Sequence, residues 1–192
     1  LWATAVMVFK ANLLLGERNY LGYKIIDLRD EVRIVPEDAR NYSRLVQAMP
    51  KDQQEFLVPR TILSALQRFG STKNIQDVAQ SIKEACETEG ERLDSELAII
   101  RYIVWAIPSI GFIGTVRGIS QALGQAHRAV EGDIIGVTVS LGVAFNSTFV
   151  ALVISLFVMF LMHQLQLMQE RFVLDTQAYC EKQLTRRLET HR

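Results

Sequence analysis

Polar side chains recur in two runs of the sequence that are otherwise apolar. The first run, residues 102–123, holds Thr115 and one formal charge, Arg117. The second run, residues 134–162, has no Asp, Glu, Lys or Arg, and its polar residues include Ser140, Asn146, Ser147 and Thr148. A hydroxyl group both donates and accepts a hydrogen bond, so it can pass one to a carboxylate or to a water. If both runs cross a membrane, these residues favour a hydrated or partner-filled path, with tight helix packing as the alternative.

The positions of these residues within the two runs predict a shared polar layer. Thr115 comes thirteen residues after Tyr102, and Thr148 comes thirteen residues before Leu161. At a rise of 1.5 Å per residue, both threonines lie roughly 20 Å from the inner ends of their helices. By the same count Arg117 lies level with Asn146.

Arg117 needs compensation at that depth, because a charge at the centre of a bilayer costs about 2.5 to 3.5 kcal/mol on insertion scales. One interpretation is that the side chain reaches the outer headgroups or is hydrogen-bonded to Asn146 and helix carbonyls. The other is that it meets a carboxylate on another subunit, because residues 102–123 and 135–162 contain no Asp or Glu.

Small residues also recur every three or four positions in both runs. Close backbone approach at such residues is how helices associate in lipid, where the hydrophobic drive is absent. We therefore expect helix packing through Gly111, Gly114, Gly118, Ala144 and Ala151.

The charges are segregated along the chain. The 192 residues include 21 basic and 21 acidic residues and are 49% hydrophobic, so the balance gives no reason to expect nucleic-acid binding. Residues 134–162 are long enough to span a bilayer, whereas most charges fall between residues 10 and 101. Basic residues after Met162 and their scarcity in the connector before residue 134 place the connector outside and the flanking segments inside.

The periodicity and the proline pattern predict helices and no strands. We expect helices at about 37–48 and 53–69, the second interrupted or restarted at Pro59, and then a long helix capped by Ser71 or Thr72 that continues into the membrane. A C-terminal helix from about 164 to 188 should continue the last span. The predicted fold is an all-α integral membrane protein with three transmembrane helices, the first truncated, and long cytoplasmic helical extensions.

Six consecutive segments follow from this interpretation. They are the end of a first transmembrane helix (1–15), a cytoplasmic helical region (16–101), a second transmembrane helix (102–123), a short periplasmic loop (124–134), a third transmembrane helix (135–162) and a cytoplasmic C-terminal helix (163–192).

The sequence gives no sign of catalysis or of a bound metal. Cys86 and Cys180 match no zinc spacing and are read as free thiols, and the three histidines have no paired spacing. No arrangement of nucleophile, base and acid is present. We therefore expect a protein that is not an enzyme and has no cofactor.

Two stretches resemble the MotA/TolQ/ExbB proton-channel family. IPSIGFIGTVRGISQAL, residues 107–123, is similar to the family's second membrane helix, and LGVAFNSTFVALVISLFV, residues 141–158, is similar to its third. Thr115 and Thr148 match the family's two pore-facing threonines. Arg117 stands where TolQ and ExbB have Trp, and Val143 stands where they have Glu.

The resemblance implies a multi-pass stator subunit of the bacterial inner membrane. Its implied partners are further copies of itself in a pentamer, membrane lipid and a dimer of a single-span protein of the ExbD, TolR or MotB kind, whose membrane Asp carries the proton. The transported ion would be H⁺, with Na⁺ as the alternative, and ion flow would drive energy transduction. The competing function is a non-conducting oligomeric membrane scaffold.

Overall fold

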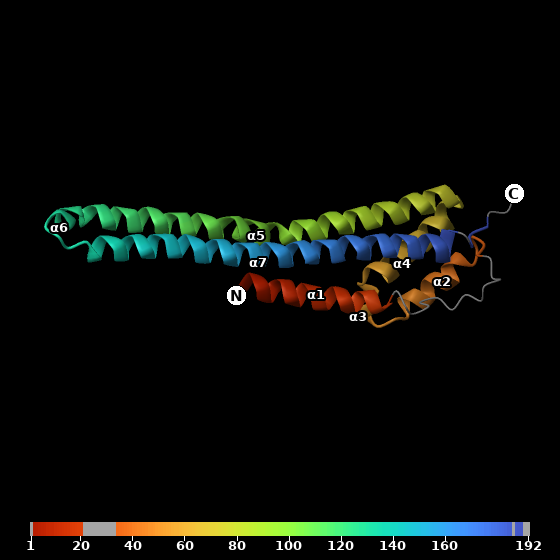
Figure 1. Cartoon of the computed structure of the whole chain (residues 1–192). Helices are drawn as coiled ribbons and strands as arrows, with labels where there is room; N and C mark the ends of the chain where they lie inside the picture. The colour runs from red at the N-terminus through yellow and green to blue at the C-terminus, as the bar shows by residue number, and fades with distance from the viewer. Residues whose placement is uncertain (1, 21–33, 186, 190–192) are drawn as a thin grey trace. The chain divides into compact units, whose positions relative to one another are not determined.

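Every named element in the described part of the chain is a helix. The computed structural model describes residues 2–20, 34–185 and 187–189 (Figure 1). The helices are α1 (Trp2–Tyr20), α2 (Ala39–Gln47), α3 (Lys51–Gln54), α4 (Leu57–Thr72), α5 (Ile75–Gly124), α6 (Ala126–Val130), α7 (Ile135–Cys180) and the π-helical η1 (Glu181–Thr185). Among the described residues, β pairing is confined to one isolated bridge between Ile34 and Leu188. The all-α prediction is confirmed.

Two helices dominate the chain. α5 has 50 residues and α7 has 46, and within the described residues they are the two helices long and apolar enough to cross a membrane. α5 is unbroken at residue 102 and α7 at residue 163, so the predicted continuity of each span with its polar extension is confirmed. The first span at residues 1–15 and the cytoplasmic location of residues 16–101 stay predictions, and residues 21–33 lie outside the described residues.

The start of the long helix differs from the prediction. The hydroxyls of Ser71 and Thr72 donate back to the Arg68 carbonyl at 2.8 and 3.0 Å and so belong to the end of α4. Lys73 then adopts a left-handed conformation with φ of 51°. Asn74 caps α5 instead, because its side-chain oxygen accepts the Gln76 N–H at 2.9 Å.

The shorter helices begin close to prolines. α2 falls within the predicted range 37–48. The next helix is predicted at 53–69 with a break or restart at Pro59, but the break lies earlier, at residues 55 and 56 between α3 and α4. Pro59 is the third residue of α4, in the first turn, where its missing N–H has no helical partner to lose. In the connector predicted as a loop, α6 forms one short helix. Gly132 in the same connector has a φ of 98°, a backbone conformation that residues with a side chain rarely adopt.

The chain divides into two compact units, Leu1–Met7 with Leu97–Leu165, and Val8–Glu96 with Gln166–Arg192. In the first unit, the C-terminal part of α5 and the N-terminal part of α7 run antiparallel and are joined through α6 (Figure 1). The second unit has a hydrophobic core in which Phe69 and Leu66 of α4, Ile82 of α5 and Leu184 of η1 are each 0 or 1% exposed.

Candidate ion pathway

The antiparallel pair formed by residues 97–124 of α5 and residues 135–165 of α7, here called the hairpin, packs through very small residues. A Cβ atom built on Gly111 would lie 2.5 Å from the Cβ of Ala151, and one built on Gly118 would lie 2.5 Å from the Cβ of Ala144. One built on Gly114 would lie 2.5 Å from the hydroxyl of Ser147. Real Cβ atoms do not come that close, so the absence of a side chain sets the helix spacing. The structure brings all five predicted packing residues to one interface.

A layer of hydroxyl groups crosses this interface at its centre. The Thr115 and Thr148 hydroxyls are hydrogen-bonded to each other. Thr115 Oγ1 also lies 3.1 Å from the carbonyl oxygen of Ala144, and Thr148 Oγ1 lies 3.1 Å from that of Gly111. The two threonines therefore share one layer, as their depth count predicted.

The acceptors around the two threonines outnumber the protons that the pair can donate. The Thr115 hydroxyl has a second carbonyl, Gly111 O, within 3.4 Å, yet each hydroxyl carries only one proton. The protons can therefore be redistributed among several acceptors without moving either helix. Such a pair can donate to or accept from an approaching carboxylate or water, although it holds no extra proton itself near neutral pH.

The other predicted pathway residues lie at different places around the hairpin. Ser140 is buried, and Ser147 is half-buried with its hydroxyl 2.8 Å from the Ala144 carbonyl. Asn146 and Arg117 are both exposed. Among the described residues no hydrogen bond joins Arg117 to Asn146, whereas the interpretation that Arg117 reaches the outer headgroups stays a prediction.

One polar contact of the hairpin was not anticipated from the sequence. Pro108 has no N–H, so the carbonyl of Val104, four residues earlier, lacks its usual helical partner. The buried Ser155 hydroxyl of α7 donates to that carbonyl at 3.3 Å. A serine in α7 thus compensates for a proline in α5. The signal in the sequence was a proline inside an apolar run facing a second run that contains a serine.

The model of the MotA/TolQ/ExbB proton channel family matches residues 53–178, more than half of the sequence. The chain belongs to this family. No curated protein and no solved structure matches it. The matched range includes the whole hairpin, so the residues that carried the resemblance lie within it. This MotA/TolQ/ExbB family member is a membrane subunit of the proton-channel type, and its family is one of channel and energy-coupling proteins that form complexes with partner proteins.

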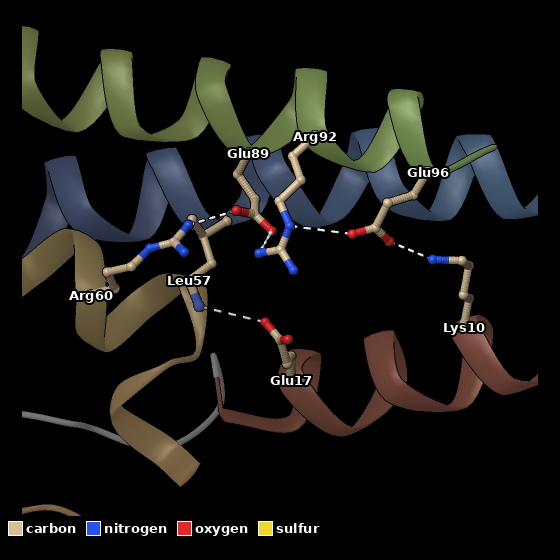
Figure 2. Close-up of polar contacts among 7 residues, drawn as sticks. All are labelled: Lys10, Glu17, Leu57, Arg60, Glu89, Arg92 and Glu96. Atoms are coloured by element: carbon tan, nitrogen blue, oxygen red, sulfur yellow. Dashed lines mark hydrogen bonds and ion pairs between the residues drawn. The ribbon is translucent and has the colours of Figure 1, made fainter. Parts of the chain in front are cut away.

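The second compact unit of this MotA/TolQ/ExbB family member contains a chain of alternating charges (Figure 2). Arg60 of α4 lies 2.6 Å from Glu89 of α5, and Arg92 lies 3.5 Å from Glu89 and 3.2 Å from Glu96. Glu96 is also paired with Lys10 of α1. Residues 87–96 include five acidic residues, a composition typical of a solvated helix face, yet the Glu89 side chain is only 12% exposed.

Glu17 of α1 points toward the same charges but forms no ion pair with any described residue (Figure 2). Burial raises the pKa of its carboxyl, with Glu89 adding to the rise, while the Leu57 N–H at 3.5 Å and the charges of Arg60 and Arg92 oppose it. The Lys10 ammonium, helped by Arg92, lowers the pKa of Glu96 against a smaller effect of burial. The two carboxyls of one cluster therefore shift in opposite directions.

A cavity of about 350 Å³ lies among these side chains. Its charged lining is mixed, with Lys10, Arg60 and Arg92 opposite Glu17, Glu55, Glu89 and Glu96. Within the described residues, no group of three or more His, Cys, Asp or Glu side chains is arranged to hold a metal ion. The cavity is therefore lined by charges of both signs.

Proposed function

We propose that this chain is the ring-forming subunit of an ion-driven stator in the bacterial inner membrane. In this proposal the chain crosses the membrane three times, with residues 1–15 ending the first span. Five copies form a ring around a dimer of a single-span partner of the ExbD, TolR or MotB kind. Ion flow through the complex drives mechanical work or energy transfer across the envelope.

The hydroxyl layer of Thr115 and Thr148 is the observation that carries the proposal. A membrane Asp of the partner would approach this layer, and the threonine hydroxyls would donate to it when it is ionised and accept from it when it is protonated. The two threonines are half-buried between α5 and α7, and a hydrogen bond at such a site is electrostatically stronger than one in bulk water. The proposed ion is H⁺, with Na⁺ as the alternative, and no bound cofactor takes part.

The proposed pathway consists of the hydroxyl layer and the polar residues around it. Those residues are Ser140, Asn146, Ser147 and Arg117. The tightly packed glycines and alanines keep the two helices at the distance at which the threonines meet.

A non-conducting membrane scaffold is the second candidate. Its support is the same glycine interface, because close helix packing alone is a sufficient reason for small residues. The scaffold does not need protons to move among the hydroxyls, so the two candidates differ in what removal of a hydroxyl does.

The test is affinity purification of the full-length tagged protein from solubilised membranes, followed by native mass measurement and proton flux in reconstituted vesicles. We expect five copies of this chain with two copies of a small single-span protein, and an inward flux that depends on both. A ring of this chain alone, with no flux and no partner, would favour the scaffold.

A further inference from the structure

The cavity of about 350 Å³ in the ionic cluster lies wholly within the second compact unit. Its lining residues come from α1, α4, α5 and α7 and from the two residues that precede α4. A volume of this size is at the lower end of the range found for small-molecule sites. The character of the lining therefore indicates which small molecule the cavity suits.

The cationic side chains of the lining are already paired. Lys10 is paired with Glu96, and Arg60 is paired with Glu89. Arg92 lies within ion-pair distance of both carboxylates (Figure 2). A ligand that carries a carboxylate or a phosphate would have to break one of these pairs. The lining therefore does not favour an anion.

Two carboxylates of the lining have no such partner. Glu17 is half-buried, and its one hydrogen bond comes from the Leu57 N–H at a long 3.5 Å. Glu55 is exposed, and neither glutamate forms an ion pair with any described residue. Burial raises the pKa of the Glu17 carboxyl, and a bound cation would stabilise its ionised form. With four carboxylates against three cations, the lining favours a cationic ligand.

A buried amide also lines the cavity. Gln169 of α7 is only 6% exposed, and its side chain forms no hydrogen bond with any described residue. Buried polar side chains in proteins are nearly always hydrogen-bonded, so this amide requires a partner that the described residues do not supply. An ammonium group carries three N–H donors and can bond to an amide oxygen and a carboxylate at once.

The remaining lining residues are apolar. They are Leu13, Leu14, Phe56, Leu57 and Leu93. Such side chains offer no ligand to a metal ion, and among the described residues no group of three or more His, Cys, Asp or Glu could hold one. They suit the methylene groups of an organic cation, because ligand sites combine an apolar lining with a few polar groups that orient the ligand.

We propose that this cavity is a binding site for a small aliphatic diamine. One ammonium group binds to the Glu17 carboxylate and the Gln169 amide oxygen, and the methylene chain lies against the leucines of α1 and α4. The second ammonium group binds to Glu55 at the exposed end of the cavity. A ligand that binds only the folded form stabilises it, so the diamine stabilises the second unit. The inference concerns this unit alone and does not depend on the proposed ion-driven function.

The experiment measures the binding of butane-1,4-diamine to the full-length protein in neutral detergent by isothermal titration calorimetry at pH 7.5. Butylamine, which has the same carbon chain and a single ammonium group, and NaCl at equal ionic strength are the comparison solutes. Glu17→Gln and Glu55→Gln remove the two carboxylates one at a time. Glu91→Gln is the matched control, because Glu91 is an exposed carboxylate of the same unit that does not line the cavity.

We expect the wild-type chain to bind one diamine. Glu17→Gln should weaken the binding of both amines at least about tenfold, because a hydrogen bond to a charged group is lost. Butylamine should bind the wild type about three- to fivefold more weakly than the diamine, since it lacks the exposed ion pair. Glu55→Gln should reduce the affinity for the diamine to that for butylamine and leave butylamine binding unchanged. Glu91→Gln should bind both amines as the wild type does.

The absence of saturable diamine binding to the wild type would overturn the inference and leave the proposed function untouched. Undiminished binding to Glu17→Gln would also overturn it, as would equal losses in Glu17→Gln and Glu91→Gln. Complete displacement of the diamine by NaCl at equal ionic strength would show unspecific attraction and overturn it too. If Glu17→Gln does not fold, Glu55→Gln decides, and unchanged diamine affinity in that variant would contradict the proposed site.

Discussion

The hydroxyl of Thr115 in α5 is hydrogen-bonded to the hydroxyl of Thr148 in α7, and each also lies within hydrogen-bonding distance of a main-chain carbonyl of the opposite helix. Residues 33 positions apart thus form one polar layer in the middle of an apolar hairpin. The layer depends on glycines at Gly111 and Gly118, which allow the backbones to approach. The hydrogen bonds of the two threonines therefore depend on the close packing of the two helices.

Removal of one hydroxyl from this layer should impair ion flow more than it impairs folding. Thr148→Val keeps the shape of the side chain but removes its hydroxyl, so we expect proton flux in vesicles to fall at least about tenfold. The free energy of unfolding should drop by about 0.5 to 1.5 kcal/mol, the usual net contribution of one hydrogen bond. Thr148→Ser, which keeps the hydroxyl, should retain most of the flux.

The matched control is Thr138→Val. Thr138 is exposed, and among the described residues its hydroxyl bonds only to the carbonyls of Ile135 in α7 and of Ile134 just before it. Its flux should equal that of the wild type. Equal flux in Thr148→Val and Thr138→Val would show that the hydroxyl layer serves helix packing and not ion flow.

A single methyl group at the hairpin interface should separate the helices. In Gly118→Ala the new Cβ would lie 2.5 Å from Ala144 Cβ and 2.9 Å from Ala144 Cα. Overpacking of this kind costs typically 1 to 3 kcal/mol, and we expect a loss of that size in detergent unfolding. Gly142→Ala is the control, because nothing lies within 4 Å of its Cβ position.

A second substitution can relieve the clash that an alanine at position 111 would create. Gly111→Ala clashes chiefly with the Ala151 Cβ at 2.5 Å. Adding Ala151→Gly should recover part of the lost stability, but not all, because Thr148 Cα remains at 3.3 Å. If the double variant is no more stable than Gly111→Ala, the contact with the Ala151 Cβ is not the cause of the lost stability.

The contact between Ser155 and the carbonyl left free by Pro108 can be tested by a double-mutant cycle. Ser155→Ala leaves the buried Val104 carbonyl without a donor, which should cost about 1 to 3 kcal/mol. In a Pro108→Ala background the restored N–H of residue 108 can satisfy that carbonyl, so the same serine substitution should cost much less. Equal costs in the two backgrounds would contradict this account. Thermal unfolding in detergent measures all four proteins.

Replacing Glu17 or Glu96 by Gln should change the stability of the protein in opposite directions, although both residues lie in one ionic cluster. The pKa of Glu17 is raised above its ordinary value of 4.5, so its ionised form destabilises the folded state and stability falls as pH rises from 4.5 through that raised pKa. Glu17→Gln should therefore stabilise the protein at pH 7.

The pKa of Glu96 is lowered below 4.5, so its contribution is present above pH 4.5 and is lost as pH falls through that lowered pKa. Glu96→Gln should destabilise the protein at pH 7, by about 0.2 to 1 kcal/mol for a partly exposed pair. Unfolding curves between pH 3 and pH 8 compare the two variants. Shifts of the same sign in both would contradict the opposing pKa directions.

The two cysteines should be unreactive until the second compact unit unfolds. Burial raises the pKa of Cys86 to about 11 and that of Cys180 to about 12, and both thiols lie in one hydrophobic core. Because the thiolate is the reactive form, a maleimide at pH 7.5 should label neither in the native protein and both after denaturation. Rapid labelling of the native protein would show that this core opens readily.

Several features followed from the sequence because they depend on helix geometry alone. The residues that share the threonine layer could be found by counting from the inner ends of two apolar runs, since a helix has a fixed rise and a short connector fixes the pairing of the two runs. The small residues of the interface followed from spacing for the same reason. The family followed from the residues around Thr115 and Thr148.

The tertiary structure decided which distant side chains meet. Lys10 and Glu96 are 86 residues apart, and nothing in the local pattern of either relates them. The acidic run before the hairpin has the composition of a solvated face, yet Glu89 is nearly enclosed by arginines from two helices. Spacing within one helix is set by the backbone, whereas pairing between helices that are not adjacent in the chain depends on how whole surfaces pack. For that reason the sequence by itself determined the helices, the hydroxyl layer and the family, and only the structure decided the ionic cluster and the helix cap at Asn74.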